Sequence, residues 1–158
     1  MGRSAPGRSS RRCTRFVTQP DPSLPKELFL SHADRDRAVA DRLSAELTRH
    51  GVPHWFSRRE LVGAQQWHDE IGEALERCDW FAVLLSPRSV ASMWVKREVL
   101  FALGDPKFER RIVPILAEDC STRQLSWALD QHQRVDLRTT WESGMRDLLR
   151  VWGLGYRG

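Results

Sequence analysis

The sequence predicts a doubly wound α/β fold, in which five parallel strands take the order 2-1-3-4-5 and helices cover both faces of the sheet. Three observations lead to this prediction. The central apolar run, Trp80 to Leu85, shows no alternation and is typical of a strand buried on both faces. Apolar runs and helical periodicities alternate five times, which indicates right-handed crossovers between parallel strands. The chain has 158 residues, enough for one domain with a core.

The first half of the chain supplies two strands and two helices. Residues 26–31 form a short strand, and Asp34 is placed to cap a helix that ends at His50-Gly51. Residues 52–56 form the second strand, in which Pro53 favours a start or an edge. A polar loop, 57–66, leads into the second helix. The apolar residues that define the two helices are Val39, Leu43 and Leu47, and then Trp67, Ile71, Ala74, Leu75 and Cys78.

The third strand, Trp80 to Leu85, is followed by a tight corner. Ser86-Pro87 ends the strand, and Ser89 is expected to cap a helix over 89–103. Its core stripe is Val95, Val99, Ala102 and Leu103. Trp94 and Glu98 are four residues apart and so share a neighbouring face of that helix. Parallel α/β sheets bind ligands at the carboxyl ends of their strands, so we expect a ligand site at this corner.

The last third completes the flavodoxin-like arrangement. Residues 111–116 form the fourth strand, a short helix is expected near 123–129, and residues 134–137 form the fifth strand. The closing helix ends at Gly153, and its apolar positions are Met145, Leu148, Leu149 and Trp152. In this strand order the ligand crevice opens between the first and third strands.

Composition divides the chain into a leader, 1–25, and a domain, 26–158. The leader is rich in Arg, Ser and Pro, and we expect it to be disordered. It holds five Arg against Asp21 alone, so it accounts for the whole net charge of +4. The balanced domain offers no electrostatic argument for nucleic acid. No run is long enough to span a bilayer and no signal peptide is evident, so a cytoplasmic location is expected.

Three cysteines without a CxxC pair indicate neither a disulfide framework nor a zinc site. Cys78 fits the core stripe of its helix, although a cysteine nucleophile with a histidine partner is left open. The sequence also lacks a GxGxxG or Walker phosphate loop, which argues against an ordinary dehydrogenase or NTPase.

Four segments, in order, resemble the Toll/interleukin-receptor (TIR) domain family. They are Leu28-Phe29-Leu30-Ser31-His32, then Glu60-Leu61-Val62-Gly63-Ala64 with Trp67, then Leu84-Leu85-Ser86-Pro87 with Ser92-Met93-Trp94-Val95-Lys96-Arg97-Glu98, and Ile112-Val113-Pro114-Ile115. The third segment matches the Ser-x-Trp-x-x-x-Glu pattern of the NAD-cleaving members. The similarity runs from about residue 26 to the C-terminus.

This resemblance implies an NAD+ nucleosidase or cyclase with Glu98 as its catalytic carboxylate. The substrate-binding residues that it implies are Ser31, His32, Ala33, Asp34, Trp67, Ser86 and Trp94. NAD+ is the substrate, and no metal or other cofactor is implied. The products are nicotinamide and either ADP-ribose or a cyclic relative. Members of the family activate by self-association through the BB loop, here 57–66. A single-domain member resembles a prokaryotic antiphage signal generator that works with a separate effector.

Other interpretations of the same residues stay open. Glu98 alone would be an ordinary solvated helix carboxylate. Trp67 and Trp94 serve equally well as core packing, and His32 as a packed loop residue. Ala33 and Asp34 stand where many relatives carry a basic residue, so Arg58 or Arg59 would have to supply charge for phosphate.

Two rival functions also stay open. The first is a non-catalytic interaction module that binds other TIR domains through the BB loop and the helix 89–103. The second is a response-regulator-like phosphoacceptor, which is disfavoured because no acidic cluster ends the first strand and no Lys follows the fourth.

Overall fold

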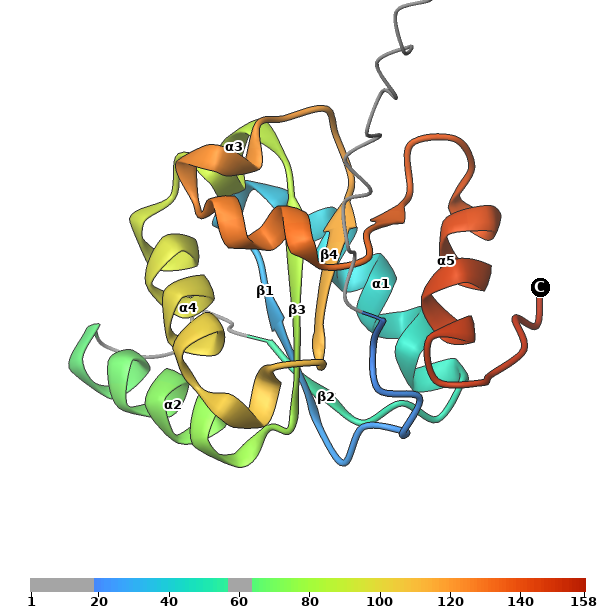
Figure 1. Ribbon diagram of the computed structural model, residues 1–158, viewed down its shortest axis with the longest axis horizontal. Helices are drawn as coiled ribbons and strands as arrows, with labels where there is room; N and C mark the ends of the chain where they lie inside the picture. Colours follow the sequence, from blue (N-terminus) through green and yellow to red (C-terminus); the bar gives the residue numbers. More distant parts are fainter. Residues whose placement is uncertain (1–18, 57–63) are drawn as a thin grey trace, which may run out of the picture.

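The computed structural model describes residues 19–56 and 64–158, and it contains one five-stranded parallel sheet in the order β2-β1-β3-β4-β5 (Figure 1). The predicted fold class and strand order are therefore confirmed. The strands are β1 (Leu28–Ser31), β2 (His54–Trp55), β3 (Trp80–Leu85), β4 (Ile112–Leu116) and β5 (Val135–Asp136). The α-helices are α1 (Arg37–Arg49), α2 (Ala64–Arg77), α3 (Pro87–Val90), α4 (Met93–Gly104) and α5 (Trp141–Arg150). The 3₁₀ helices are η1 (Asp34–Asp36), η3 (Pro106–Phe108), η4 (Thr122–Gln124) and η5 (Trp127–Gln131).

Helices pack on both faces of the sheet, which explains why β3 is apolar throughout. In Figure 1, α2 and α4 lie on one side of the strands and α1 and α5 on the other. The side chains of β3 alternate between two core clusters, with Phe81, Val83 and Leu85 facing α2 and α4. The other three, Trp80, Ala82 and Leu84, face α1 and α5. All six are buried.

The corner between β3 and α4 differs from the prediction that Ser89 caps the long helix. Ser86 instead caps the one-turn helix α3, where its Oγ accepts a hydrogen bond from the Ser89 amide at 3.1 Å. The Ser89 Oγ in turn accepts from the Ser86 amide at 2.8 Å, which completes a capping box. Ser92 then caps α4, accepting from the Val95 amide at 3.3 Å. Pro87 fits the first turn of α3 because it needs no amide partner there.

The start of the first helix also differs from the prediction. Asp34 was expected to be its cap, but Asp34 lies inside η1, and Asp36 occupies the N-cap position of α1. The Asp36 side chain makes no cap hydrogen bond to the helix. It bonds across the sheet edge instead, because the side chains of Ser86, the N-cap of α3, and of Arg88 on α3 approach it there.

Two further elements are shorter or more broken than predicted. The second strand covers only His54–Trp55, because Pro53 has no amide hydrogen to continue the ladder. The short helix expected near 123–129 is two 3₁₀ helices, η4 and η5. Ser126 separates them, since its side chain caps the amide of Ala128 at 3.2 Å.

Part of the predicted leader contacts the domain. Asp21 accepts hydrogen bonds from Nε and Nη2 of Arg111, both at 3.0 Å, and its amide donates to the Arg110 carbonyl at 2.9 Å. Residues 19–25 are thus ordered against the amino end of β4, while residues 1–18 of the predicted leader lie outside the described residues. No helix within the described ranges combines the length and apolar character needed to cross a membrane.

Candidate functional site

Glu98 is a buried carboxylate at the sheet edge where β1 ends. It lies on α4 between Val95 and Val99, which face the core, and only 7% of its surface is exposed. The Ser31 hydroxyl, at the end of β1, donates a hydrogen bond to its Oε2. A buried carboxylate costs free energy unless hydrogen bonds compensate for the water it has lost, and Ser31 supplies such a bond. Glu98 is therefore not the solvated helix carboxylate that the sequence left open.

Two tryptophans, one on α2 and one on α4, contact each other, and the second precedes Glu98 by one turn of α4. The Trp67 and Trp94 rings meet edge to face, with centroids 4.3 Å apart and planes at 86°. Trp67 is buried in the core cluster beneath α2 and α4, whereas Trp94 is half-buried and carries the Arg97 guanidinium 5.0 Å above its ring. Trp67 therefore packs as a core residue. Trp94, one turn before Glu98, is only half-buried and also lies 6.2 Å from the His68 ring, centroid to centroid.

The loop after β1 is mostly packed. His32 and Ala33 are buried, and the His32 ring contacts the edge of the Phe56 ring at a centroid distance of 5.5 Å. The Ala33 carbonyl accepts from the Asp36 amide at 2.9 Å. Asp34 is exposed on η1. A ligand at this edge would thus meet the backbone of the loop and the Asp34 side chain rather than the His32 ring.

Ser86 is fully buried and takes part in the internal structure of the edge. Its hydroxyl donates to Oδ2 of Asp36, so the one proton it has is already used. Asp36 also accepts from Nε of Arg88 at 2.5 Å, and Nη2 of Arg88 donates to Glu118, just after β4. The hydrogen bond to Glu118, and to a smaller extent the hydrogen bond to Asp36, raise the pKa of Arg88 above its usual range.

Asp36, Arg88 and Glu118 were missed by the sequence interpretation. The available signal was a second acid, Asp36, two residues beyond the predicted cap, but its partners lie 50 and 52 residues away in the chain. The structure brings together Ser31, His32, Ala33, Ser86 and Glu98 at the shared edge of β1 and β3. Residues 57–63 of the predicted BB loop, with Arg58 and Arg59, lie outside the described residues.

Two other kinds of site, a cysteine nucleophile and a metal centre, can be examined in the structure. Burial raises the pKa of the Cys78 thiol to about 12, which removes it as a nucleophile near neutral pH. Within residues 19–56 and 64–158, no group of three or more His, Cys, Asp and Glu side chains is arranged to hold a metal ion. A carboxylate fixed in a poorly hydrated position can stabilise a developing positive charge or accept a proton.

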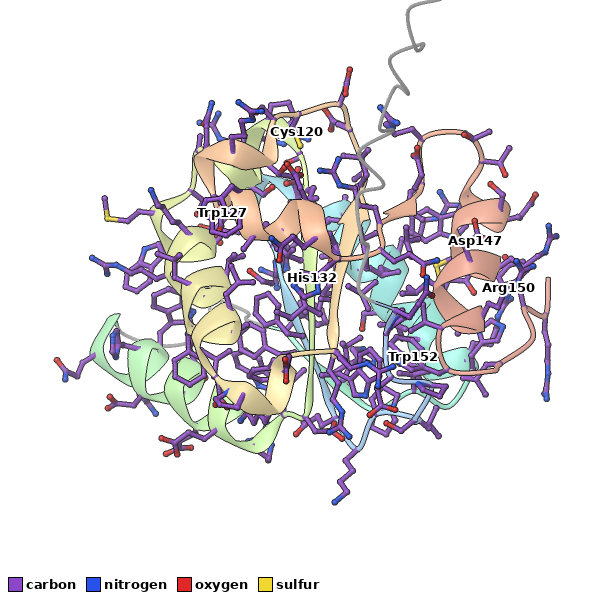
Figure 2. The ribbon with its side chains drawn as sticks, in the orientation of Figure 1. Cys120, Trp127, His132, Asp147, Arg150 and Trp152 are labelled. Atoms are coloured by element: carbon purple, nitrogen blue, oxygen red, sulfur yellow. The ribbon has the colours of Figure 1, made fainter. Side chains whose placement is uncertain are left out.

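A separate cleft of about 500 Å³ lies between the end of α4 and η5. It is lined in part by Leu103, Asp105, Glu109 and His132, and Figure 2 shows His132 in front of the strands. It also borders Ile112, the first residue of β4, so it opens toward the amino end of that strand. The cleft is therefore distinct from the edge that carries Glu98.

Comparison with known proteins points to one family. The family model described as "TIR domain" matches residues 28–149. The TIR domain of the Toll-related receptor TRR-2 from Hydra magnipapillata has a TM-score of 0.63 and 21% identity, with 78% of this chain and 94% of that chain covered. The TIR domains of the activated Roq1 resistosome, which recognises the pathogen effector XopQ, have a TM-score of 0.62 and 18% identity, with 78% and 97% covered. No curated protein sequence matches the chain.

Proposed function

The chain belongs to the TIR domain family, and we propose that it cleaves the nicotinamide–ribose bond of NAD+ with Glu98 as the catalytic carboxylate. One observation carries this proposal. Glu98 is 7% exposed and receives a hydrogen bond from Ser31, at the edge where β1 and β3 end. Glutamate is seldom buried, and a buried carboxylate at the edge where parallel strands end is a candidate for a functional group.

The chemistry follows from the charge of the reacting sugar. Departure of neutral nicotinamide breaks the C–N bond and leaves a ribose with oxocarbenium character. A fixed anion near that ribose stabilises the positive charge of the transition state more than it stabilises the ground state. Water then adds to the sugar to give ADP-ribose and releases a proton. If another atom of the same nucleotide attacks instead, the product is cyclic.

The other site residues take supporting roles in this proposal. Ser31 orients the Glu98 carboxylate, since it donates directly to Oε2. The half-buried Trp94 offers an aromatic wall one turn before Glu98. The backbone of the loop formed by Ser31, His32, Ala33 and Asp34 borders the nucleotide, while Trp67 and Ser86 support that wall and loop from inside.

Assembly and biological role belong to the same proposal. NAD+ cleavage requires self-association through the BB loop, residues 57–66, as in other enzymes of the family. The product serves as a signal in prokaryotic antiphage defence, read by a separate effector, and the reaction takes place in the cytoplasm. Membership of the TIR family supports the self-association.

Nicotinamide release tests the proposal directly. The purified full chain is incubated with NAD+ at high concentration or on a crowding surface, and nicotinamide is measured by chromatography. Glu98→Gln should lower the rate on the order of 10²–10³-fold, because the substitution removes the charge but keeps the shape. Glu73→Gln, an identical change on the exposed face of α2, serves as the matched control and should keep the wild-type rate.

Two results would reject this function. Equal nicotinamide release by wild type and Glu98→Gln would remove Glu98 from the mechanism. No release by the wild type under any assembling condition, with self-association intact, would favour the non-catalytic interaction module.

A further inference from the structure

The buried side chain of Asp36 joins three parts of the fold near the candidate site. Asp36 is 3% exposed and follows β1, its partner Ser86 ends β3, and its partner Arg88 lies on α3. Arg88 extends the connection to Glu118, which follows β4. The carboxyl ends of three adjacent strands, β1, β3 and β4, are therefore connected through one carboxylate and one guanidinium.

The position of Asp36 shows that these bonds replace a simpler local one. Aspartate at a helix N-cap usually accepts from the first helical amides, which stabilises the start of the helix. At the N-cap of α1, Asp36 makes no such bond. Its two carboxylate oxygens accept instead from Ser86 and from Arg88, at 2.5 Å in the second case. The side chain thus contributes to the arrangement of the sheet edge rather than to the end of its own helix.

These contacts hold the loop 31–36 at both ends. At its first residue, Ser31 donates to Glu98 on α4. At its last residue, Asp36 is bound by Ser86 and Arg88. Between them, the Asp36 amide donates to the Ala33 carbonyl at 2.9 Å, which closes the turn. A loop with both ends fixed on the segment from β3 to α4 holds the Ser31 hydroxyl in one place relative to Glu98.

We propose that Asp36, acting through Ser86 and Arg88, is a positioning residue that fixes the loop 31–36 and with it the Ser31–Glu98 pair. This inference rests on the proposed NAD+ cleavage, because it assigns Asp36 a part in that reaction. Asp36 touches neither the substrate nor the reacting atoms in this scheme. Its effect on the rate arises because a small displacement of a catalytic group can cost on the order of 10²-fold.

The test compares Arg88→Gln, Arg88→Lys and the double variant Asp36→Asn/Arg88→Gln with a matched arginine elsewhere. The double variant leaves no uncompensated buried charge, so it should fold if a single change does not. Arg111→Gln is the control, because Arg111 also bridges two carboxylates, Asp21 and Asp79, and its side chain is 31% exposed against 33% for Arg88. Arg111 lies next to the amino end of β4, away from the candidate site.

Two readouts are taken on each variant, steady-state cleavage of NAD+ and hydrogen exchange by mass spectrometry. We expect Arg88→Gln and the double variant to lower kcat by roughly 10–100-fold with a smaller change in KM, since orientation rather than binding is lost. Arg88→Lys keeps the positive charge and should recover kcat only in part, because one ammonium cannot reach both carboxylates as the guanidinium fork does. Amides of residues 32–36 should exchange several-fold faster, with those of β3 unchanged. Arg111→Gln should change neither readout at this edge.

The two readouts separate failure of this inference from failure of the proposed function. Unchanged exchange in residues 32–36 would overturn the inference whether or not the chain cleaves NAD+. Faster exchange with wild-type kcat would show that Asp36 fixes the loop without serving catalysis, and would also overturn it. A wild type that releases no nicotinamide would reject the enzymatic function and, with it, any catalytic role of Asp36, while the exchange data would still report whether the loop is held.

Discussion

Substitution of Ser31 by alanine should show how much the Ser31–Glu98 hydrogen bond contributes to the free energy of unfolding. Ser31 is 1% exposed and Glu98 is 7% exposed, so no bulk water replaces the lost hydroxyl. A hydrogen bond to a charged group contributes about 1.5–3 kcal/mol, against about 0.5–1.5 kcal/mol for a neutral pair. Ser31→Ala should therefore lower the free energy of unfolding by about 1.5–3 kcal/mol at pH 7.

The second arm of the experiment asks whether this cost depends on the charge of Glu98. In a Glu98→Gln background, Ser31 donates to a neutral amide oxygen, and its removal should cost only about 0.5–1.5 kcal/mol. The double-mutant cycle should accordingly give a coupling energy of roughly 1–1.5 kcal/mol between Ser31 and Glu98. Urea unfolding of the four proteins, with midpoints compared at constant m-value, measures each term.

The cycle has clear opposing outcomes. If Ser31→Ala costs the same in both backgrounds, the hydroxyl does not compensate a charge on Glu98. If it costs less than about 0.5 kcal/mol in the wild type, the bond carries no appreciable energy. Either result would refute the argument that a buried anion is held at this edge. With a fixed anion, Glu98→Gln itself should be neutral or stabilising, because it removes the cost of burying charge.

Three further predictions concern the rest of the domain. Gly144→Ala should destabilise by about 1–3 kcal/mol in urea unfolding, because a Cβ there would lie 2.7 Å from the carbonyl oxygen of Asp136; Gly72→Ala, with nothing within 4 Å, should instead stabilise by roughly 0.5–1 kcal/mol. Burial lowers the pKa of His132 below its ordinary 6.5, so the unfolded chain binds the proton more tightly. Stability should therefore fall as the pH drops below 6.5, and His132→Gln should show less of this fall when both proteins are unfolded at several pH values. Because burial raises the pKa of Cys78 to about 12, iodoacetamide at pH 8 should alkylate it only after unfolding, and rapid labelling of the Cys78 peptide in the native protein, located by mass spectrometry, would contradict its buried position.

The elements that sequence analysis predicted well are those with a strong local period. The range predicted for β3, Trp80 to Leu85, agrees with the structure, because burial on both faces requires an uninterrupted apolar run. The buried positions Val95, Val99 and Ala102 were identified from helical spacing alone. The residues that cap the helices were harder to predict from the sequence. Several serines near β3 have cap chemistry, and the choice of Ser86 and Ser92 over Ser89 depended on how the chain turned after Pro87.

Some features of the candidate site were also predicted from the sequence, and others were not. Its expected location at the carboxyl edge followed from alternating strands and helices, and Glu98 was named because its segment resembles the Ser-x-Trp-x-x-x-Glu pattern of NAD-cleaving TIR domains. The burial of Glu98 did not follow, since helix glutamates are ordinarily exposed. The Asp36 network was not foreseen at all, because its hydrogen-bonded partners are 30 to 52 residues apart and no local pattern relates them.

The sequence by itself determined the alternation of strands and helices, which residues line the core, and the TIR motifs. Each of these is a pattern among residues close in the chain, and backbone geometry sets the period of the apolar patterns. Only the tertiary structure decided which polar side chains are enclosed and with what partners. Ser31 meets Glu98, and Asp36 meets Arg88, because the order of strands in the sheet places their ends together. Packing between distant segments decides which charged side chains are buried. Burial gives such a charge a cost in free energy and also strengthens its interaction with other charges.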